Sequence, residues 1–164
     1  MIPLDETLDS LLSTEVKSAY IYGLPVPQGS ARAFNRGGKI VVTSDNQNLK
    51  KWRTFCAFVL RKDISAGETI EGPVCVDLAF YFERPKSHLN GSGSLRKGQS
   101  TSHIVKPDLD KLVRAILDAG TDGLVWHDDA QVVRLTASKQ YVQASGAEAL
   151  PGVRVKVWKE GTND

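Results

Sequence analysis

The segment at residues 106–131 constrains the fold of this 164-residue chain most strongly, because it sets a short amphipathic helix between two pairs of acidic residues. Its sequence is KPDLDKLVRAILDAGTDGLVWHDDAQ. Pro107 suits the first turn of a helix, and Gly120 suits its end. The helix would carry an apolar stripe of Leu109, Leu112, Val113, Ile116 and Leu117. Such a stripe must pack against a second layer of structure.

That second layer is predicted to be a sheet, because alternating or clustered apolar residues occur on both sides of the helix. Strands are expected at residues 16–23, 74–83, 132–142 and 153–157, with a hairpin turn at 36–39. A second helix, capped by residue 45 or 46, is expected to run to about residue 62. The fold class is therefore α/β (α+β), a single domain with a mixed sheet and two main helices. The domain is expected over residues 16–160, after an acidic N-terminal arm at 1–15.

The patterns also predict which side chains face inward. On the strand at 132–142, one face carries Val133, Leu135, Ala137, Lys139 and Tyr141, and this face should turn toward the core. Lysines are rarely buried without a partner, so the Lys139 ammonium is expected either to reach solvent at the sheet edge or to approach the acidic residues.

The second helix has an inward stripe of Leu49, Trp52, Phe55, Cys56, Val59 and Leu60. Trp52 and Trp126 are interpreted as core residues, with contact to a substrate as the alternative for Trp126. His103 and His127 are interpreted as exposed polar residues. Cys56 and Cys75 are not at metal-ligand spacing and are interpreted as small buried hydrophobic residues.

The overall composition is that of a globular protein, with 41% hydrophobic and 24% charged residues. A net charge of +2 is too small to indicate a nucleic-acid partner by itself. No apolar run is long enough to span a membrane, and the N-terminus lacks the pattern of a signal peptide. We therefore expect a cytoplasmic protein without a membrane partner.

A long polar segment at residues 84–105 is rich in Gly, Ser and basic residues. Loops of this length inside a compact domain are usually functional or disordered. One interpretation is a solvated loop. The other is a flexible basic arm that follows DNA phosphates, with Lys86, Arg96 and Lys97 as the contacting residues.

The acidic residues themselves have two interpretations. Asp110, Arg114 and Asp118 have i, i+4 spacing and could form an exposed ladder of ion pairs. Alternatively, Asp108 and Asp110 hold a cation together with the later acidic pair, because carboxylates held close together repel one another unless a cation lies between them. Oxygen ligands favour Mg²⁺, which takes further ligands from water and phosphate, so this interpretation predicts a metal-dependent phosphate chemistry.

Helical geometry limits the metal interpretation. Residues two positions apart on a helix point about 200° apart, so Asp108 and Asp110 cannot converge if both lie inside it. They can converge if Asp108 lies in extended chain just before the first turn, which Pro107 favours.

The motifs KPDLDKLVRAILDAG and GLVWHDDAQVV, in this order and at this spacing, resemble the RusA family of Holliday junction resolvases of bacteria and their phages. Weaker similarity extends over LPVPQGSARAFNRGGKIVV, RPKSH and ASKQY, and so covers most of residues 16–158. The resemblance implies a metal-dependent endonuclease that acts as a homodimer on branched DNA in recombination and repair. The implied cofactor is Mg²⁺.

Carried over residue by residue, the resemblance implies that Asp108, Asp110 and Asp129 bind the metal, with Asp128 as a supporting acid. The family has a catalytic lysine four residues after the second Asp of the first motif, and this chain has Arg114 there. Arginine can clamp a phosphate but cannot donate its proton. The catalytic set is thus Asp108, Asp110, Asp129 and Arg114. The expected DNA contacts are Lys86, Arg96, Lys97, Lys106, Lys111 and Lys139.

Two other functions remain open from the sequence. A branched-DNA-binding protein without catalysis would explain the change from lysine to Arg114. A small enzyme acting on nucleotides could also use an acidic site, although the basic loop at 84–105 argues against it.

Overall fold

The structure, a computed structural model, describes residues 15–29, 32–43 and 47–161. Its main sheet has the strand order β1-β6-β4-β5. The four strands are β1 Lys17–Tyr22, β4 Val74–Phe82, β5 Val132–Tyr141 and β6 Gly152–Lys159. The pairs β1–β6 and β4–β6 are antiparallel, and β4–β5 is parallel. The predicted mixed sheet is therefore confirmed.

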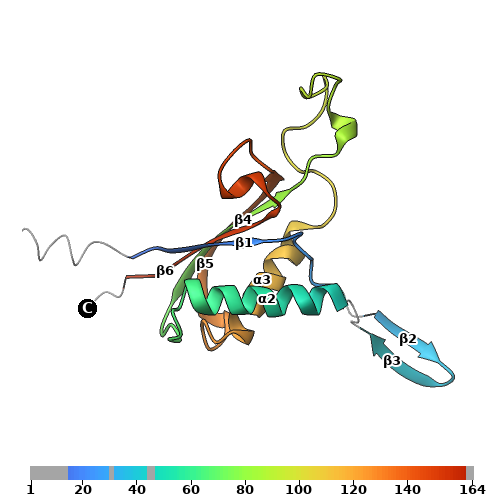
Figure 1. Cartoon of the computed structure of the whole chain (residues 1–164). Coiled ribbons are helices and arrows are strands. Elements are labelled where there is room, and N and C mark those ends of the chain that lie inside the picture. The colour runs from blue at the N-terminus through green and yellow to red at the C-terminus, as the bar shows by residue number, and fades with distance from the viewer. Residues whose placement is uncertain (1–14, 30–31, 44–46, 162–164) are drawn as a thin grey trace, which may run out of the picture.

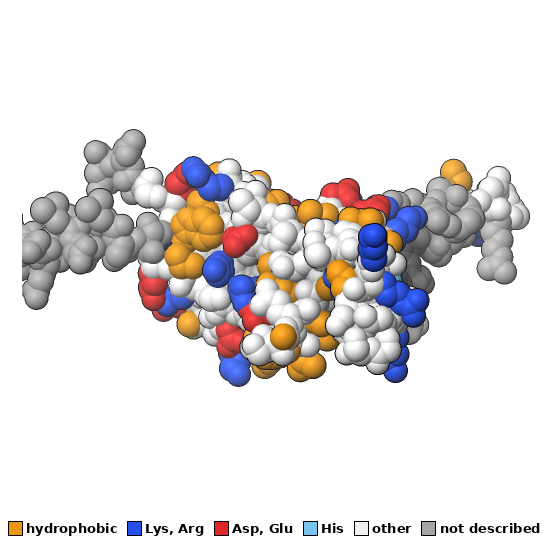
Figure 2. Space-filling model, turned by 90° about the horizontal axis from the view of Figure 1, so that it is seen from above, with side chains coloured by type: hydrophobic (Ala, Val, Ile, Leu, Met, Phe, Trp, Pro, Cys, Tyr) orange, Lys and Arg blue, Asp and Glu red, His pale blue; other side chains and the backbone are white. Residues whose placement is uncertain are grey.

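Two helices, α2 Gln47–Asp63 and α3 Leu109–Asp122, pack on one face of this sheet (Figure 1). β4 supplies the centre of the core, since it is paired on both sides and Val74, Val76, Leu78 and Phe80 are fully buried. The single α+β domain with two main helices agrees with the fold class expected from the sequence. Seen from above (Figure 2), the molecule shows charged side chains of both signs interspersed with hydrophobic ones.

Both ends of α3 differ from the prediction. The helix begins at Leu109, with Asp108 as its N-cap, so Pro107 precedes the first turn. It continues through Gly120 to Asp122, and Gly123 is the C-cap. Gly120 has a packing role instead of ending the helix. A Cβ atom there would lie 2.1 Å from Cζ2 of Trp126, whose ring is fully buried as predicted.

The predicted inward face of β5 is only partly covered. Tyr141 is buried, but Val133 and Leu135 are 55% and 42% exposed. The reason is topological, because β5 is an edge strand of the sheet and the register shifts between Val74 and Cys75 opposite its first residues. Alternation along the strand gives the face of each residue, but it does not show how far the helices extend over that face.

The expected hairpin forms from β2 Arg32–Arg36 and β3 Lys39–Thr43, and it extends from the N-terminal end of α2 (Figure 1). On α2, the side chain of Phe55 is 44% exposed, so its assignment to the inward stripe was wrong. Trp52, Cys56 and Cys75 are buried as expected, and both cysteines are free. The proposed caps of this helix at 45 and 46, and the arm at 1–14, lie outside the described residues.

Candidate nuclease site

Asp108 lies in extended chain at the start of α3, with φ −70° and ψ 139°. Its side chain makes no capping hydrogen bond to the helix, although its backbone carbonyl accepts from Leu112 N at 3.2 Å. The carboxylate is 49% exposed and lies 3.4 Å from Lys111 Nζ. Asp108 is therefore outside the helix, as convergence with Asp110 requires.

Lys139 holds the chain that leads to Asp108. Its ammonium donates hydrogen bonds to the carbonyl oxygens of Val105 and Pro107, the latter at 2.7 Å. These two carbonyls flank Lys106, which joins Pro107 through a cis peptide bond. Of the two outcomes considered for Lys139, the structure shows the second: its ammonium reaches the segment that leads to the acidic residues and contacts backbone carbonyls there. Its expected contact with DNA stays a prediction.

The residues Asp110, Arg114 and Asp118 are one turn apart on α3, and we call them the α3 acidic strip. Asp110 and Arg114 are exposed, and within the described part of the chain neither forms an ion pair. Asp118 lies 3.9 Å from Arg53 Nη1, and Arg53 Nη2 lies 2.6 Å from Asp122. The expected ladder within α3 is thus replaced by pairing of Asp118 and Asp122 with an arginine from α2.

Asp128 and Gln131 form a capping box around the 3-10 helix η2 Asp129–Gln131. Asp128 Oδ1 accepts from Ala130 N at 2.7 Å, and Gln131 Oε1 accepts from His127 N at 2.7 Å and Asp128 N at 3.2 Å. Gln131 Nε2 donates to the carbonyls of Ile70 and Gly72 at 3.0 Å each. Asp128 therefore has a structural use, and Gln131 fixes the turn that presents Asp129.

Asp129 has a pKa above its ordinary value. The largest cause is burial, which raises the pKa. A hydrogen bond with Asp128 and the negative charges of Asp128 and Asp118 raise it further. The guanidinium of Arg114 opposes it. Asp129 thus lies beside the second half of the α3 acidic strip, where its carboxyl group is near those of Asp118 and Asp128.

The structure brings Asp129 together with Arg114 and Asp118. Asp110 and Asp118 are about 12 Å apart along the helix axis, from a rise of about 1.5 Å per residue. Among the residues with described positions, no three His, Cys, Asp or Glu side chains are arranged to hold a metal ion. The donor chemistry still fits Mg²⁺, which is commonly bound by one or two carboxylates plus water and phosphate. Asp108 and Asp110 are the pair that would hold it.

The loop at 84–105 is attached to the body at both ends. The guanidinium of Arg84 lies 3.8 Å from the centre of the Tyr141 ring and donates to Ser100 O at 2.9 Å. His103 is only 6% exposed and stacks on Phe82 at 4.3 Å, so its interpretation as an exposed residue was wrong. Its pKa is lowered by burial and by the charge of Lys139. Lys86, Arg96, Lys97 and Lys106 are exposed, as DNA contacts require.

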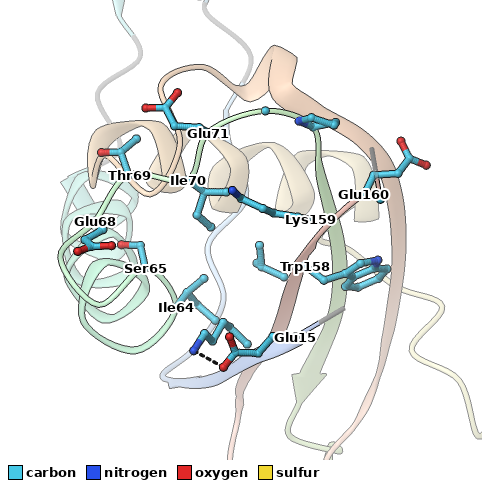
Figure 3. Close-up of a pocket in the computed structure, with 15 residues that line it drawn as sticks. Glu15, Ile64, Ser65, Glu68, Thr69, Ile70, Glu71, Trp158, Lys159 and Glu160 are labelled. Carbon is cyan, nitrogen blue, oxygen red and sulfur yellow. Dashed lines mark hydrogen bonds and ion pairs between the residues drawn. The ribbon is translucent and has the colours of Figure 1, made fainter. Parts of the chain in front are cut away.

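A pocket of about 550 Å³ lies where β4 begins and β6 ends, away from Asp108 and Asp110 (Figure 3). Its lining includes Glu15, Glu68, Glu71 and Glu160 but only two lysines, Lys17 and Lys159. His127 Nε2 contacts Glu71 at 2.7 Å on its rim. This excess of carboxylates disfavours a phosphate ligand, and none of the predicted catalytic residues lines the pocket.

A comparison with known protein families identifies the family of this chain. The family model described as endodeoxyribonuclease RusA matches residues 23–157, which include every predicted catalytic residue. The chain belongs to the RusA family. Membership indicates an endodeoxyribonuclease and implies activity on Holliday junctions, a form of branched DNA. The chain is also similar to the uncharacterized protein YqaN of Bacillus subtilis (strain 168), at 34% identity over 133 residues, covering 79% of this chain and 91% of the relative.

Sequence reasoning passed over two residues of this candidate site, Arg53 and Gln131. Gln131 had a detectable signal, because Asp128 and Gln131 have the spacing of a capping box. Arg53 had none, since its pairing with Asp118 and Asp122 depends on how α2 packs against α3. No helix in the described part of the chain is long and apolar enough to cross a membrane.

Proposed function

We propose that this protein is a Mg²⁺-dependent endonuclease that resolves four-way DNA junctions, and related branched DNA, during recombination and repair in the bacterial cytoplasm. The observation that carries the proposal is a row of acidic side chains along α3, of which Asp108 and Asp110 are exposed. It begins at Asp108, continues through the α3 acidic strip, and has Asp129 beside its second half. A carboxylate row in a protein of slightly positive net charge suits a cation that will in turn bind phosphate.

The residues would share the chemistry as follows. Asp108 and Asp110 would hold the metal at the positive end of α3. When bound, Mg²⁺ lowers the pKa of a coordinated water and neutralises charge on the phosphate. Arg114 has no ion-pair partner among the described residues, and its guanidinium can bind two phosphate oxygens while staying protonated. The leaving oxygen must therefore take its proton from a group other than Arg114.

We further propose that the active form is a homodimer. A four-way junction needs two symmetric cuts, which suits a protein with twofold symmetry. Among the described residues no three acidic side chains are arranged to hold a metal ion. A twofold-related copy could complete the site by placing Asp129 of the partner subunit near Asp108 and Asp110, which favours the same conclusion.

The catalytic proposal is tested with Asp110→Asn on a synthetic four-way junction with Mg²⁺ or with EDTA. We expect cleavage to fall by about 10²–10³-fold, as for loss of one electrostatic stabiliser of a transition state, while junction binding is retained. Glu68→Gln is a matched control, since it removes an exposed carboxylate away from α3. Cleavage by Asp110→Asn at the wild-type rate, or wild-type protein that binds junctions without cutting them, would contradict the proposal. The second result would favour a non-catalytic DNA-binding protein.

The shared site is tested by mixing two inactive variants, Asp110→Asn and Asp129→Asn. If each site combines acids from both subunits, a mixed dimer has one site with two defects and one intact site, so nicking activity returns. If each site lies within one chain, both sites of the mixed dimer are defective and nicking stays absent.

A further inference from the structure

The outer face of α2 carries two exposed aromatic side chains between lysines. Lys51, Phe55, Phe58 and Lys62 follow one another at intervals of four, three and four residues, which places them on one line along the helix. Phe55 is 44% and Phe58 is 64% exposed. The opposite face of α2, with Leu49, Trp52, Cys56 and Leu60, is buried in the core. We call the exposed line of Lys51, Phe55, Phe58 and Lys62 the α2 outer stripe.

The surroundings of the α2 outer stripe are basic. A shallow hollow is lined by Lys50, Lys51, Thr54, Phe55 and Phe58. Within the described residues, none of the three lysines of this face forms an ion pair. Helix α2 carries five basic residues and one acidic residue, Asp63 at its C-terminal end, and the sequence of the hairpin at 32–43 has basic residues and no acidic one. Phe55 and Phe58 therefore lie among three lysines that form no ion pair within the described residues.

The α2 outer stripe is fixed relative to the catalytic acids. Arg53, on another side of α2, pairs with Asp118 and Asp122 of α3, and a Cβ atom at Gly123 would lie 2.7 Å from the carbonyl oxygen of Ala57. The two helices are thus in close contact. The hairpin β2–β3 extends from the N-terminal end of the same helix (Figure 1).

We propose that the α2 outer stripe is a DNA-binding surface on which unstacked bases at the branch point contact Phe55 and Phe58, while the flanking lysines bind phosphates. The proposal rests on the proposed function. Aromatic rings bind bases by stacking, and cations beside them follow the backbone. A second copy of this chain is a poorer occupant. A twofold contact would bring the unpaired lysines of one stripe against those of the other.

The test measures the affinity of full-length variants for a four-way junction and for a linear duplex in EDTA, where no cleavage occurs. We expect Phe55→Gln/Phe58→Gln to weaken junction binding by about 5–150-fold, the range for loss of stacking on one base, with little change for the duplex. We expect Lys51→Gln/Lys62→Gln to weaken both, and to reduce the slope of log K against log salt by about 1.8. Leu150→Gln is the matched control, because Leu150 is 59% exposed and lies outside α2.

Unchanged junction affinity in the phenylalanine variant overturns the surface proposal. Conversion of a wild-type dimer to monomers by the same variant, measured by sedimentation, also overturns it and assigns the stripe to the dimer interface. Each result is separable from the proposed function. If the wild-type protein cleaves junctions and the phenylalanine variant binds them with unchanged affinity, the surface proposal fails and the nuclease proposal stands. If the wild-type protein binds junctions without cleaving them and the phenylalanine variant binds them more weakly, the surface proposal stands and the nuclease proposal fails.

Discussion

Replacing Lys139 with methionine removes the two hydrogen bonds that hold the chain before Asp108. The ammonium donates to the carbonyls of Val105 and Pro107, and methionine keeps the unbranched apolar part of the side chain without a donor. A hydrogen bond to a charged group contributes about 1.5–3 kcal/mol. Because Val105 is 55% exposed, water can solvate a released carbonyl. We therefore expect a total loss near that of one such bond, about 1.5–3 kcal/mol.

The loss is measured by urea denaturation and by thermal unfolding, where each kcal/mol corresponds to about 2–4 °C for a domain of this size. A local measurement identifies the cause. Amide exchange at Leu112, which donates to Asp108 O in the first turn of α3, should become faster. If Lys139 positions Asp108 for catalysis, junction cleavage should also fall, by about 10²-fold for a displacement near 1 Å.

Arg134→Met is the control for loss of a cation from the same strand. Arg134 pairs with Glu160 at 3.2 Å on the surface, and such pairs contribute about 0–1 kcal/mol. The reasoning is refuted if Lys139→Met unfolds at the wild-type urea concentration and the Leu112 amide exchanges at the wild-type rate. It is also refuted if Arg134→Met gives the same loss as Lys139→Met.

Three further predictions concern stability. The pKa of His103 is lowered from 6.5, so the unfolded chain binds its proton more readily, and wild-type stability should fall as pH decreases through 6.5 toward the folded pKa. His103→Phe keeps the stack on Phe82 and should reduce the difference in urea midpoint between about pH 8 and about pH 5; an unchanged difference would exclude His103 as its source. Gly120→Ala should destabilise the protein by about 1–3 kcal/mol in thermal unfolding despite the better helix propensity of alanine, because the new Cβ meets the Trp126 ring; a stabilised variant would disprove this packing argument. Asp128→Ala should cost about 0.5–2 kcal/mol through loss of the cap on Ala130 N, whereas Asp128→Asn keeps an acceptor and should cost less; equal losses would argue that the charge matters and the cap does not.

The sequence by itself determined the elements and their order. The four strands of the main sheet and the two helices packed on it were predictable from local periodicity, because side chains alternate on a strand and recur every three to four residues on a helix. The resemblance to the family marked Asp108, Asp110 and Asp129, and the spacing of Asp128 and Gln131 held a capping signal that went unused. These are properties of neighbouring residues, which local geometry fixes.

Only the tertiary structure decided how these elements meet. It placed Asp129 beside Arg114 and Asp118, joined Lys139 to the carbonyls before Asp108, and buried His103 against Phe82. It also left Phe55 and Leu135 exposed, where periodicity had predicted burial. The physical reason is the same in each case. Periodicity gives the direction of a side chain from its own element, but burial and pairing depend on which other element covers that face.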